Sequence, residues 1–223
     1  MPTVLLKLIW PMQSWGVVSR FDQRDTFREP SKSGVLGLVC AAMGIERSDF
    51  AKQAPLYTVR MGVRHDKPGI LRYDFQTAAC KKTDSIIRAD GKHANDGGVI
   101  SRRYYLADAA FLVGLESCDL TLLEAISYAL NNPVWPIYMG RKSYVPSEPI
   151  LCGTEPFNMP LEEALRHHPL LHSIRNSAAV NNILMSIETT TREGLFVMDQ
   201  PQGALQERRF TARYLKTETI EIC

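Results

Sequence analysis

The residues best suited to binding chemistry lie in a short loop at residues 138–144, with the sequence YMGRKSY. A glycine lets the backbone come close to a ligand, while arginine, lysine and serine side chains donate hydrogen bonds to phosphate oxygens. The composition therefore predicts a phosphate-binding loop, and the alternative is a glycine turn with two exposed charges. The residues expected to make the contacts are Tyr138, Gly140, Arg141, Lys142 and Ser143.

A second candidate is the amino end of the helix expected over residues 30–45, PSKSGVLGLVCAAMGI, which Gly44 is placed to end. The helix opens on Lys32, Ser33 and Gly34. Unpaired backbone N–H groups and the helix dipole attract anions at such an end, so we predict a second phosphate contact. The alternative is that the glycines only let the helix pack close to a strand.

The loop after the first apolar strand is a third candidate. Gln13, Ser14 and Trp15 follow that strand, and a tryptophan beside an amide is suited to stacking on and hydrogen bonding to an unpaired base. Trp15 has an equally ordinary alternative, which is to cover the edge of the core. Arg20 and Arg24 follow in a polar stretch with aromatic neighbours, where they are expected to contact an RNA backbone or their acidic neighbours.

Positive charge is concentrated in residues 60–104, which hold ten lysines and arginines against five aspartates, although the formal charge of the whole chain is only +2. We expect a basic arm at about 60–105, built from a hairpin of strands at 57–65 and 70–78 and a returning strand with Arg102 and Arg103. A concentrated basic segment is typical of a nucleic-acid contact. A solvated hairpin without a partner is the alternative.

The order of the remaining elements predicts an α+β protein. The βαββαβ order indicates a ferredoxin-like body of the RRM type over residues 1–152, with the arm projecting from it as a protruding basic β-hairpin. After residue 152 the pattern loosens into a short helix and three strands, which predict a small β-rich C-terminal unit over 153–223. The body elements are expected at 3–10, 30–45, 57–65, 109–116, 120–131 and near residue 150.

Catalytic and metal motifs are weak. The five cysteines are scattered and never form a C-x-x-C pair, and Pro169 interrupts the histidine cluster at 167–172, so neither a metal nor a cofactor is expected. His65 and His93 could serve a metal-independent ribonuclease, but nothing in their spacing favours them over other residues. Without a membrane-length apolar run or a signal peptide, we expect a cytoplasmic protein that does not enter a membrane.

Four stretches carry a resemblance to a known family. They are LIWPMQSWG, PSKSGVLGLVCAAMGIERSD, YYLADAAFLVGL and YMGRKSYVPSEPI. In this order and spacing they resemble the CasD-type subunits of type I-E CRISPR Cascade complexes, members of the RRM-like RAMP superfamily.

The resemblance implies a non-catalytic subunit with a thumb hairpin that holds the 5′ handle of the CRISPR RNA and caps the backbone filament for interference against foreign DNA. The handle would lie against residues 13–15, 32–34 and 140–143. The implied partners are the adjacent backbone subunit and the large PAM-reading subunit, with target DNA reached only through the complex. The alternative is a metal-independent endoribonuclease that processes CRISPR repeat RNA, as type I-C relatives are understood to do.

Overall fold

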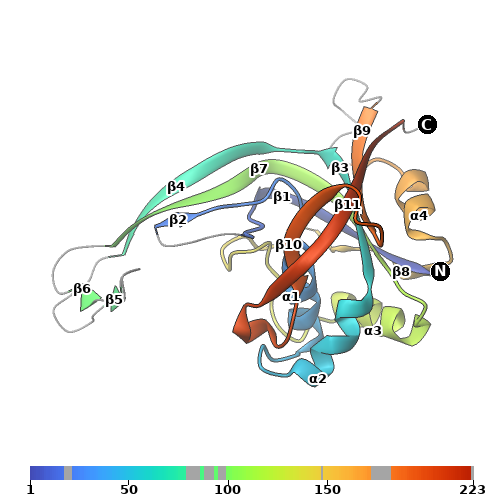
Figure 1. Ribbon diagram of the computed structural model, residues 1–223, viewed down its shortest axis with the longest axis horizontal. Helices are drawn as coiled ribbons and strands as arrows, with labels where there is room; N and C mark the ends of the chain where they lie inside the picture. Colours follow the sequence, from blue (N-terminus) through green and yellow to red (C-terminus); the bar gives the residue numbers. More distant parts are fainter. Residues whose placement is uncertain are drawn as a thin grey trace.

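The computed structural model describes residues 1–17, 22–78, 86–87, 93–94, 99–146, 148–171 and 182–221. It shows an α+β protein, as the sequence predicts, in which a large sheet dominates and the helices are few (Figure 1). The strands are β1 (Thr3–Gln13), β2 (Gln23–Arg24), β3 (Arg60–Lys67), β4 (Ile70–Ala78), β5 (Ile86–Ile87), β6 (His93–Ala94), β7 (Val99–Glu116), β8 (Leu151–Phe157), β9 (Asn182–Thr189), β10 (Leu195–Pro201) and β11 (Phe210–Glu221). The helices are α1 (Lys32–Met43), α2 (Phe50–Gln53), α3 (Leu120–Asn131) and α4 (Leu161–His167), with short 3-10 turns at Ala54–Thr58 and Leu205–Glu207.

Seven strands of the main sheet run in the order β10-β11-β9-β3-β7-β1-β8, and each neighbouring pair is antiparallel. α1 follows β1 and α3 follows β7, and side chains of both helices pack with those strands in one apolar core, which includes Leu8, Val39, Phe111 and Ile126. A second apolar cluster joins α4 to β1, β3, β7 and β9. The C-terminal strands continue this sheet, because β9 pairs with β3. The division of the chain at residue 152 stays a prediction.

Two of the predicted helices show why local sequence signals can be reliable. α1 ends at Gly44, whose φ of 68° is the left-handed conformation that glycine adopts without strain. α3 begins after Asp119, whose carboxylate accepts a hydrogen bond from the Leu122 N–H at 3.0 Å. Both helices are confirmed close to their predicted bounds, and each has one end marked by a capping residue.

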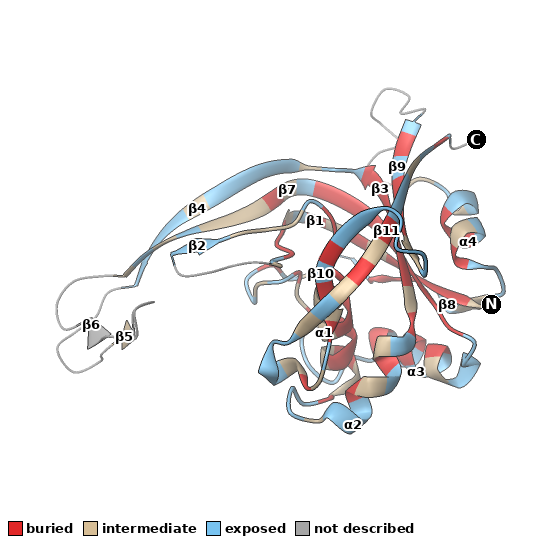
Figure 2. Cartoon of the chain, viewed as in Figure 1, coloured by how far each residue is buried: buried red, intermediate tan, exposed pale blue. Residues whose placement is uncertain are grey.

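The arm differs from its prediction. β3 and β4 do not form a hairpin with each other; both pair with β7, β3 along residues 110–116 and β4 along residues 99–107. The turn-like stretch at Pro68 and Gly69 is therefore a break between two successive strands. β3 lies buried in the body, so the arm consists of β4 and the outer part of β7, with β2 alongside (Figures 1 and 2). Most of the expected tip, residues 80–98, lies outside the described residues.

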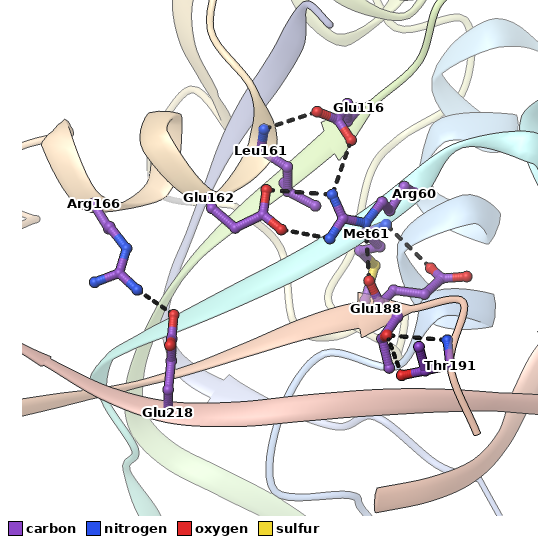
Figure 3. A network of polar contacts seen from close by, with 10 residues as sticks. Arg60, Met61, Glu116, Leu161, Glu162, Arg166, Glu188, Thr191 and Glu218 are labelled. Atoms are coloured by element: carbon purple, nitrogen blue, oxygen red, sulfur yellow. Dashed lines mark hydrogen bonds and ion pairs between the residues drawn. The ribbon is translucent and has the colours of Figure 1, made fainter. Parts of the chain in front are cut away.

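Ion pairs fasten α4 to the sheet (Figure 3). Glu116 accepts a hydrogen bond from the Leu161 N–H at the start of α4, at 2.9 Å, and it also pairs with Arg60. Arg60 makes a second pair with Glu162, while Arg166 further along α4 pairs with Glu218 of β11. α4 is thus tied both to the centre of the sheet and to its C-terminal strands.

No helix within the described ranges is long and apolar enough to cross a membrane.

Candidate nucleic-acid interface at the base of the arm

Three segments that are distant in the sequence meet where the arm joins the body. The Ser14 N–H donates to the Met139 carbonyl at 3.1 Å, and the Ser14 hydroxyl donates to the Tyr104 carbonyl at 3.2 Å. Arg141 donates to the same carbonyl at 2.6 Å. The structure therefore brings together Ser14, the 138–143 loop and the Arg102–Arg103 region, all of which the sequence singled out separately.

Gly140 lets the loop come this close. Its φ is +88°, and a Cβ placed on it would lie 1.8 Å from the Ser14 carbonyl oxygen. Only glycine allows this approach between the two segments. In the structure the group that approaches Gly140 is the protein's own chain, and the phosphate contact predicted for this loop stays a prediction.

Arg141 positions the loop instead of being free to bind a ligand. Its guanidinium donates to the Tyr144 hydroxyl at 2.7 Å, lies 5.3 Å from the centre of that ring, and is 4.0 Å from the Asp74 carboxylate. Burial raises the pKa of Tyr144 although Arg141 opposes the shift, so the hydroxyl stays neutral and accepts from Arg141. Lys142 and Ser143 are exposed at the outside of the loop, and Tyr138 is half-buried.

We call Arg24, Arg72 and Arg103 the basic face of the arm. β4 and β7 pair so that Arg72 lies opposite Tyr105 and Asp74 opposite Arg103, and directly opposed residues share one face of an antiparallel pair. β2 pairs in parallel with β7 and places Arg24 beside Arg103. Arg24 and Arg72 are exposed and have no ion-pair partner among the described residues.

The opposite side of the arm carries an aromatic face, which the sequence analysis missed. Tyr73 lies opposite Tyr104 with ring centres 5.6 Å apart, and the Arg102 guanidinium lies 6.0 Å from the Tyr73 ring centre. Arg102 and Arg103, which were predicted to act together, therefore point to opposite faces. The alternation of apolar and polar residues along β4 carried this signal. The members of the aromatic face are Leu71, Tyr73, Phe75, Ile100 and Tyr104, with Arg102 among them.

Gln13 and Trp15 are buried and do not lie on an exposed loop. Trp15 is 1% exposed, and its indole N–H donates to the Gln13 side-chain oxygen at 3.1 Å. The Gln13 amide in turn donates to the carbonyls of Leu8 and Ala109, both at 2.9 Å. The expectation of an exposed stacking surface was wrong, because this pair seals the core and satisfies its own polar groups there.

The amino end of α1 is also not open to a phosphate. The Lys32 N–H donates to the Asp199 carboxylate at 2.7 Å, and the Lys32 side chain binds both oxygens of Glu188 at 2.9 Å. Burial lowers the pKa of Lys32, and Glu188 opposes that shift. The helix end does attract anionic groups, as expected, but these are the protein's own carboxylates, Glu188 of β9 and Asp199 of β10.

Ser33 and Gly34, which follow Lys32 at that helix end, are half-buried. A Cβ on Gly34 would lie 2.9 Å from the Trp15 ring, so Gly34 serves close packing. Asp199 itself is held by the Arg213 guanidinium, which donates to both of its oxygens. Arg20 lies outside the described residues.

Of the candidate catalytic histidines, His65 is buried and paired. His65 is 8% exposed and lies 2.6 Å from the Glu29 carboxylate, while the neighbouring Arg64 is enclosed and pairs with Asp66. Burial raises the pKa of Cys40 to about 12, so this thiol is protonated at neutral pH. The described part of the chain holds no cluster of residues arranged to bind a metal ion.

Comparison with known proteins identifies the family. The family model described as CRISPR-associated protein (Cas_Cas5) matches residues 3–217, so the chain belongs to this family. It is 28% identical over 183 residues to the CRISPR system Cascade subunit CasD of Escherichia coli (strain K12), covering 79% of this chain and 82% of that protein. This agrees with the resemblance to CasD-type subunits carried by the sequence motifs.

Two solved structures are similar over nearly the whole chain. A crystal structure of a Cas protein is 41% identical with a TM-score of 0.77, covering 99% of this chain and 95% of that one. A chain of a CRISPR RNA-guided surveillance complex is 29% identical with a TM-score of 0.80, covering 99% of this chain and 90% of that one.

Proposed function

We propose that the chain is a non-catalytic subunit of a Cascade-type CRISPR surveillance complex, where it binds the 5′ handle of the CRISPR RNA and caps the backbone filament. Membership in the CRISPR-associated family and similarity to CasD support the subunit role. The observation that carries the RNA contact is the meeting of Ser14, the 138–143 loop and the basic face at the base of the arm.

We further propose that β1-α1-β3-β7-α3-β8 is a ferredoxin-like body of the RAMP type and that the arm is its thumb. The strand order β3-β7-β1-β8, with a helix after β1 and another after β7, supports this assignment. In that reading the C-terminal strands are an extension of the body, joined to it through β3 and β9.

The two faces of the arm suit two kinds of partner. Arg24 and Arg72 provide unshared positive charge for the phosphates of the handle, half-buried Arg103 lies on the same face opposite Asp74, and Lys142 and Ser143 add donors beside it. The aromatic face exposes Tyr73 and Phe75 to 55% and 60%, which favours contact with an adjacent backbone subunit over contact with water. A large PAM-reading subunit would border the same surface, and target DNA would be reached only through the complex. Such a complex acts in the cytoplasm, away from any membrane.

The endoribonuclease alternative is less well supported. It needs a histidine that can reach the RNA backbone, and His65 is enclosed with its ring nitrogen on Glu29. His93 lies in β6, and its side chain is outside what the structure describes. Binding the RNA without cleaving it requires only the hydrogen-bond donors at the base of the arm.

The test is to measure how the Arg103→Ala/Lys142→Ala double variant binds labelled CRISPR RNA at several salt concentrations. We expect affinity to fall at least tenfold and the salt dependence to flatten, because each phosphate contact of a single strand contributes about 0.7 to the logarithmic slope. The matched control is Lys52→Ala/Lys216→Ala, which removes the same charge from α2 and β11. Equal affinity and slope for the two double variants would reject the basic face as the RNA contact.

A further inference from the structure

β4 (Ile70–Ala78) is an exposed strand at the outer edge of the arm (Figures 1 and 2). It pairs with β7, and β2 pairs with the same part of β7 from the other side, so no described strand covers the second side of β4. Every residue of β4 is exposed except Asp74, which is half-buried. A strand with one free side presents a row of backbone N–H and C=O groups that can pair with another chain.

β4 lacks most of the features that keep such an edge from pairing. Its sequence, ILRYDFQTA, contains neither proline nor lysine, and its register with β7 continues from Ile70 to Ala78 without a bulge. Leu71, Tyr73 and Phe75 also leave apolar surface exposed along the strand. A long, regular and partly apolar edge is a site where another strand is expected to add to the sheet.

The two charges of β4 make this edge complementary to itself. When two identical strands pair antiparallel around a two-fold axis, the axis passes beside one residue, which lies opposite its own copy. With the axis at Tyr73, Arg72 of each copy lies opposite Asp74 of the other, so two pairs of opposite charge form. With the axis at Arg72 or at Asp74, two like charges would lie opposite each other, which is unfavourable. An axis at Leu71 or at Phe75 would pair neither charge.

The same alignment also matches the apolar side chains. Opposed residues share a face, so Leu71 of each copy lies opposite Phe75 of the other, and the two Tyr73 rings meet at the axis. Both charges are available for pairing. Arg72 is exposed without an ion-pair partner among the described residues, and the ion pair described for Asp74 is a long one, 4.0 Å from Arg141. The strand therefore fits a second copy of itself on both faces at once.

We propose that the free chain forms a dimer in which the β4 edges of two copies pair antiparallel over residues 70–76, with the two-fold axis at Tyr73. The pairing joins the two arms into one sheet with the strand order β2-β7-β4-β4-β7-β2 and one continuous aromatic face. Because the paired arms run in opposite directions, the two bodies lie at opposite ends of this sheet. The inference goes beyond the proposed RNA contact and does not depend on it, since it concerns the chain without RNA.

The experiment is sedimentation velocity of the full chain without RNA, at protein concentrations from about 1 to 200 μM. We expect a reversible monomer–dimer equilibrium with a dissociation constant on the order of 10–100 μM, because the interface is small. Arg72→Asp places two carboxylates opposite Asp74 and should weaken the dimer about tenfold or more. The exchanged variant Arg72→Asp/Asp74→Arg restores opposite charges, so its dissociation constant should return to within about threefold of the wild type.

The control is Arg192→Asp, which makes the same change in an exposed loop between β9 and β10 and should leave the dimer unaltered. A dimer that Arg72→Asp does not weaken, or that the exchanged variant does not restore, would overturn the proposal. A chain that stays monomeric at every concentration would also overturn it and would leave the edge to a strand of a different protein.

Disulfide cross-linking tests the register in a chain whose Cys80, Cys118 and Cys223 are replaced by serine. Tyr73→Cys should form an intermolecular disulfide under mild oxidation, because the two Cβ atoms would lie about 5 Å apart beside the axis. Gln76→Cys is the matched control on the same exposed edge. Its two copies would lie about 20 Å apart in this register and should not cross-link. Equal cross-linking at the two positions, or none at Tyr73→Cys, would contradict the proposed pairing.

Discussion

The contact of Gly140 with Ser14 sets a limit on the residue at position 140. Gly140→Ala should destabilise the protein by about 1–3 kcal/mol, because a Cβ would collide with a backbone oxygen at a positive φ. The free energy of unfolding in urea measures this. Gly37→Ala is the matched control: a Cβ there meets nothing within 4 Å, and alanine in α1 should stabilise by about 0.5–1 kcal/mol. Equal effects at the two positions would contradict the close approach.

Trp15 is expected to act through the core. Because its ring is fully enclosed, Trp15→Ala should lower the free energy of unfolding by about 3–5 kcal/mol. Trp15→Leu keeps an apolar side chain in the core but removes the aromatic ring, so it should keep part of the stability and all of the RNA affinity, since no base stacks on the ring. A folded Trp15→Leu variant that had lost RNA binding would restore the stacking role instead.

For individual residues, the sequence identifies the residue type but not the tertiary partners that the side chain contacts. Lys32 was expected at an open helix end because its neighbours in sequence suggest one, whereas Glu188 and Asp199, which enclose it, lie more than 150 residues away. The phosphate-binding role of the 138–143 loop stays a prediction, and what its sequence indicates locally is only that Gly140 can adopt a positive φ. Its contact with Ser14 depends on tertiary structure and had no signal of its own.

Among the helices and strands, the predicted bounds were right where a capping residue marks one end of the element. α1 and α3 follow from Gly44 and Asp119, which lie at those ends. The hairpin of β3 with β4 was wrong because pairing is a long-range property. Pro68 and Gly69 look like a turn, yet both flanking strands continue along the eighteen-residue β7.

The arm itself can be shortened without disturbing the body. Ala78 and Val99 are paired across the arm, so replacing residues 79–98 by Asn-Gly closes it with a two-residue hairpin turn. We expect the thermal unfolding midpoint of the body to be preserved, and assembly on guide RNA with the other CRISPR subunits to fall at least tenfold. Size-exclusion chromatography of the reconstituted complex measures this. Full assembly would show that the outer arm is dispensable.

The attachment of α4 should depend on pH. Burial raises the pKa of Glu162, but its hydrogen bonds and the positive charges of Arg60 and Arg166 together hold the pKa below its ordinary value. A lowered carboxyl pKa adds stability above the unfolded-state pKa, and that stability is lost as the pH falls through the folded-state pKa. Glu162→Gln should therefore cost about 0.5–1 kcal/mol at pH 7 and little at pH 3.

Glu163→Gln is the control for that measurement, because Glu163 is exposed in the same turn of α4 without a described side-chain partner. Urea denaturation of both variants from pH 3 to pH 7 follows the difference. A cost at Glu162 that does not change with pH would mean that its charge is not what holds α4.

Across the whole molecule, the exposed arginines of the arm are separated from exposed carboxylates on α3 and β8. The arm presents Arg24, Arg72 and Arg103, while Glu124 of α3 and Glu155 of β8 are exposed on the body. The near-neutral total of +2 conceals this separation, and the sequence revealed only its basic half because the basic residues cluster along the chain.

The central claim is that the chain holds the handle of a CRISPR RNA without cutting it. The most direct measurement compares the purified chain binding labelled RNA with its 5′ handle and the same RNA with the handle replaced, in EDTA, followed on native and denaturing gels. We predict tighter binding with the handle, steep weakening with salt and no cleavage. Equal binding of both RNAs, or a discrete cut in the handle RNA, would contradict the account.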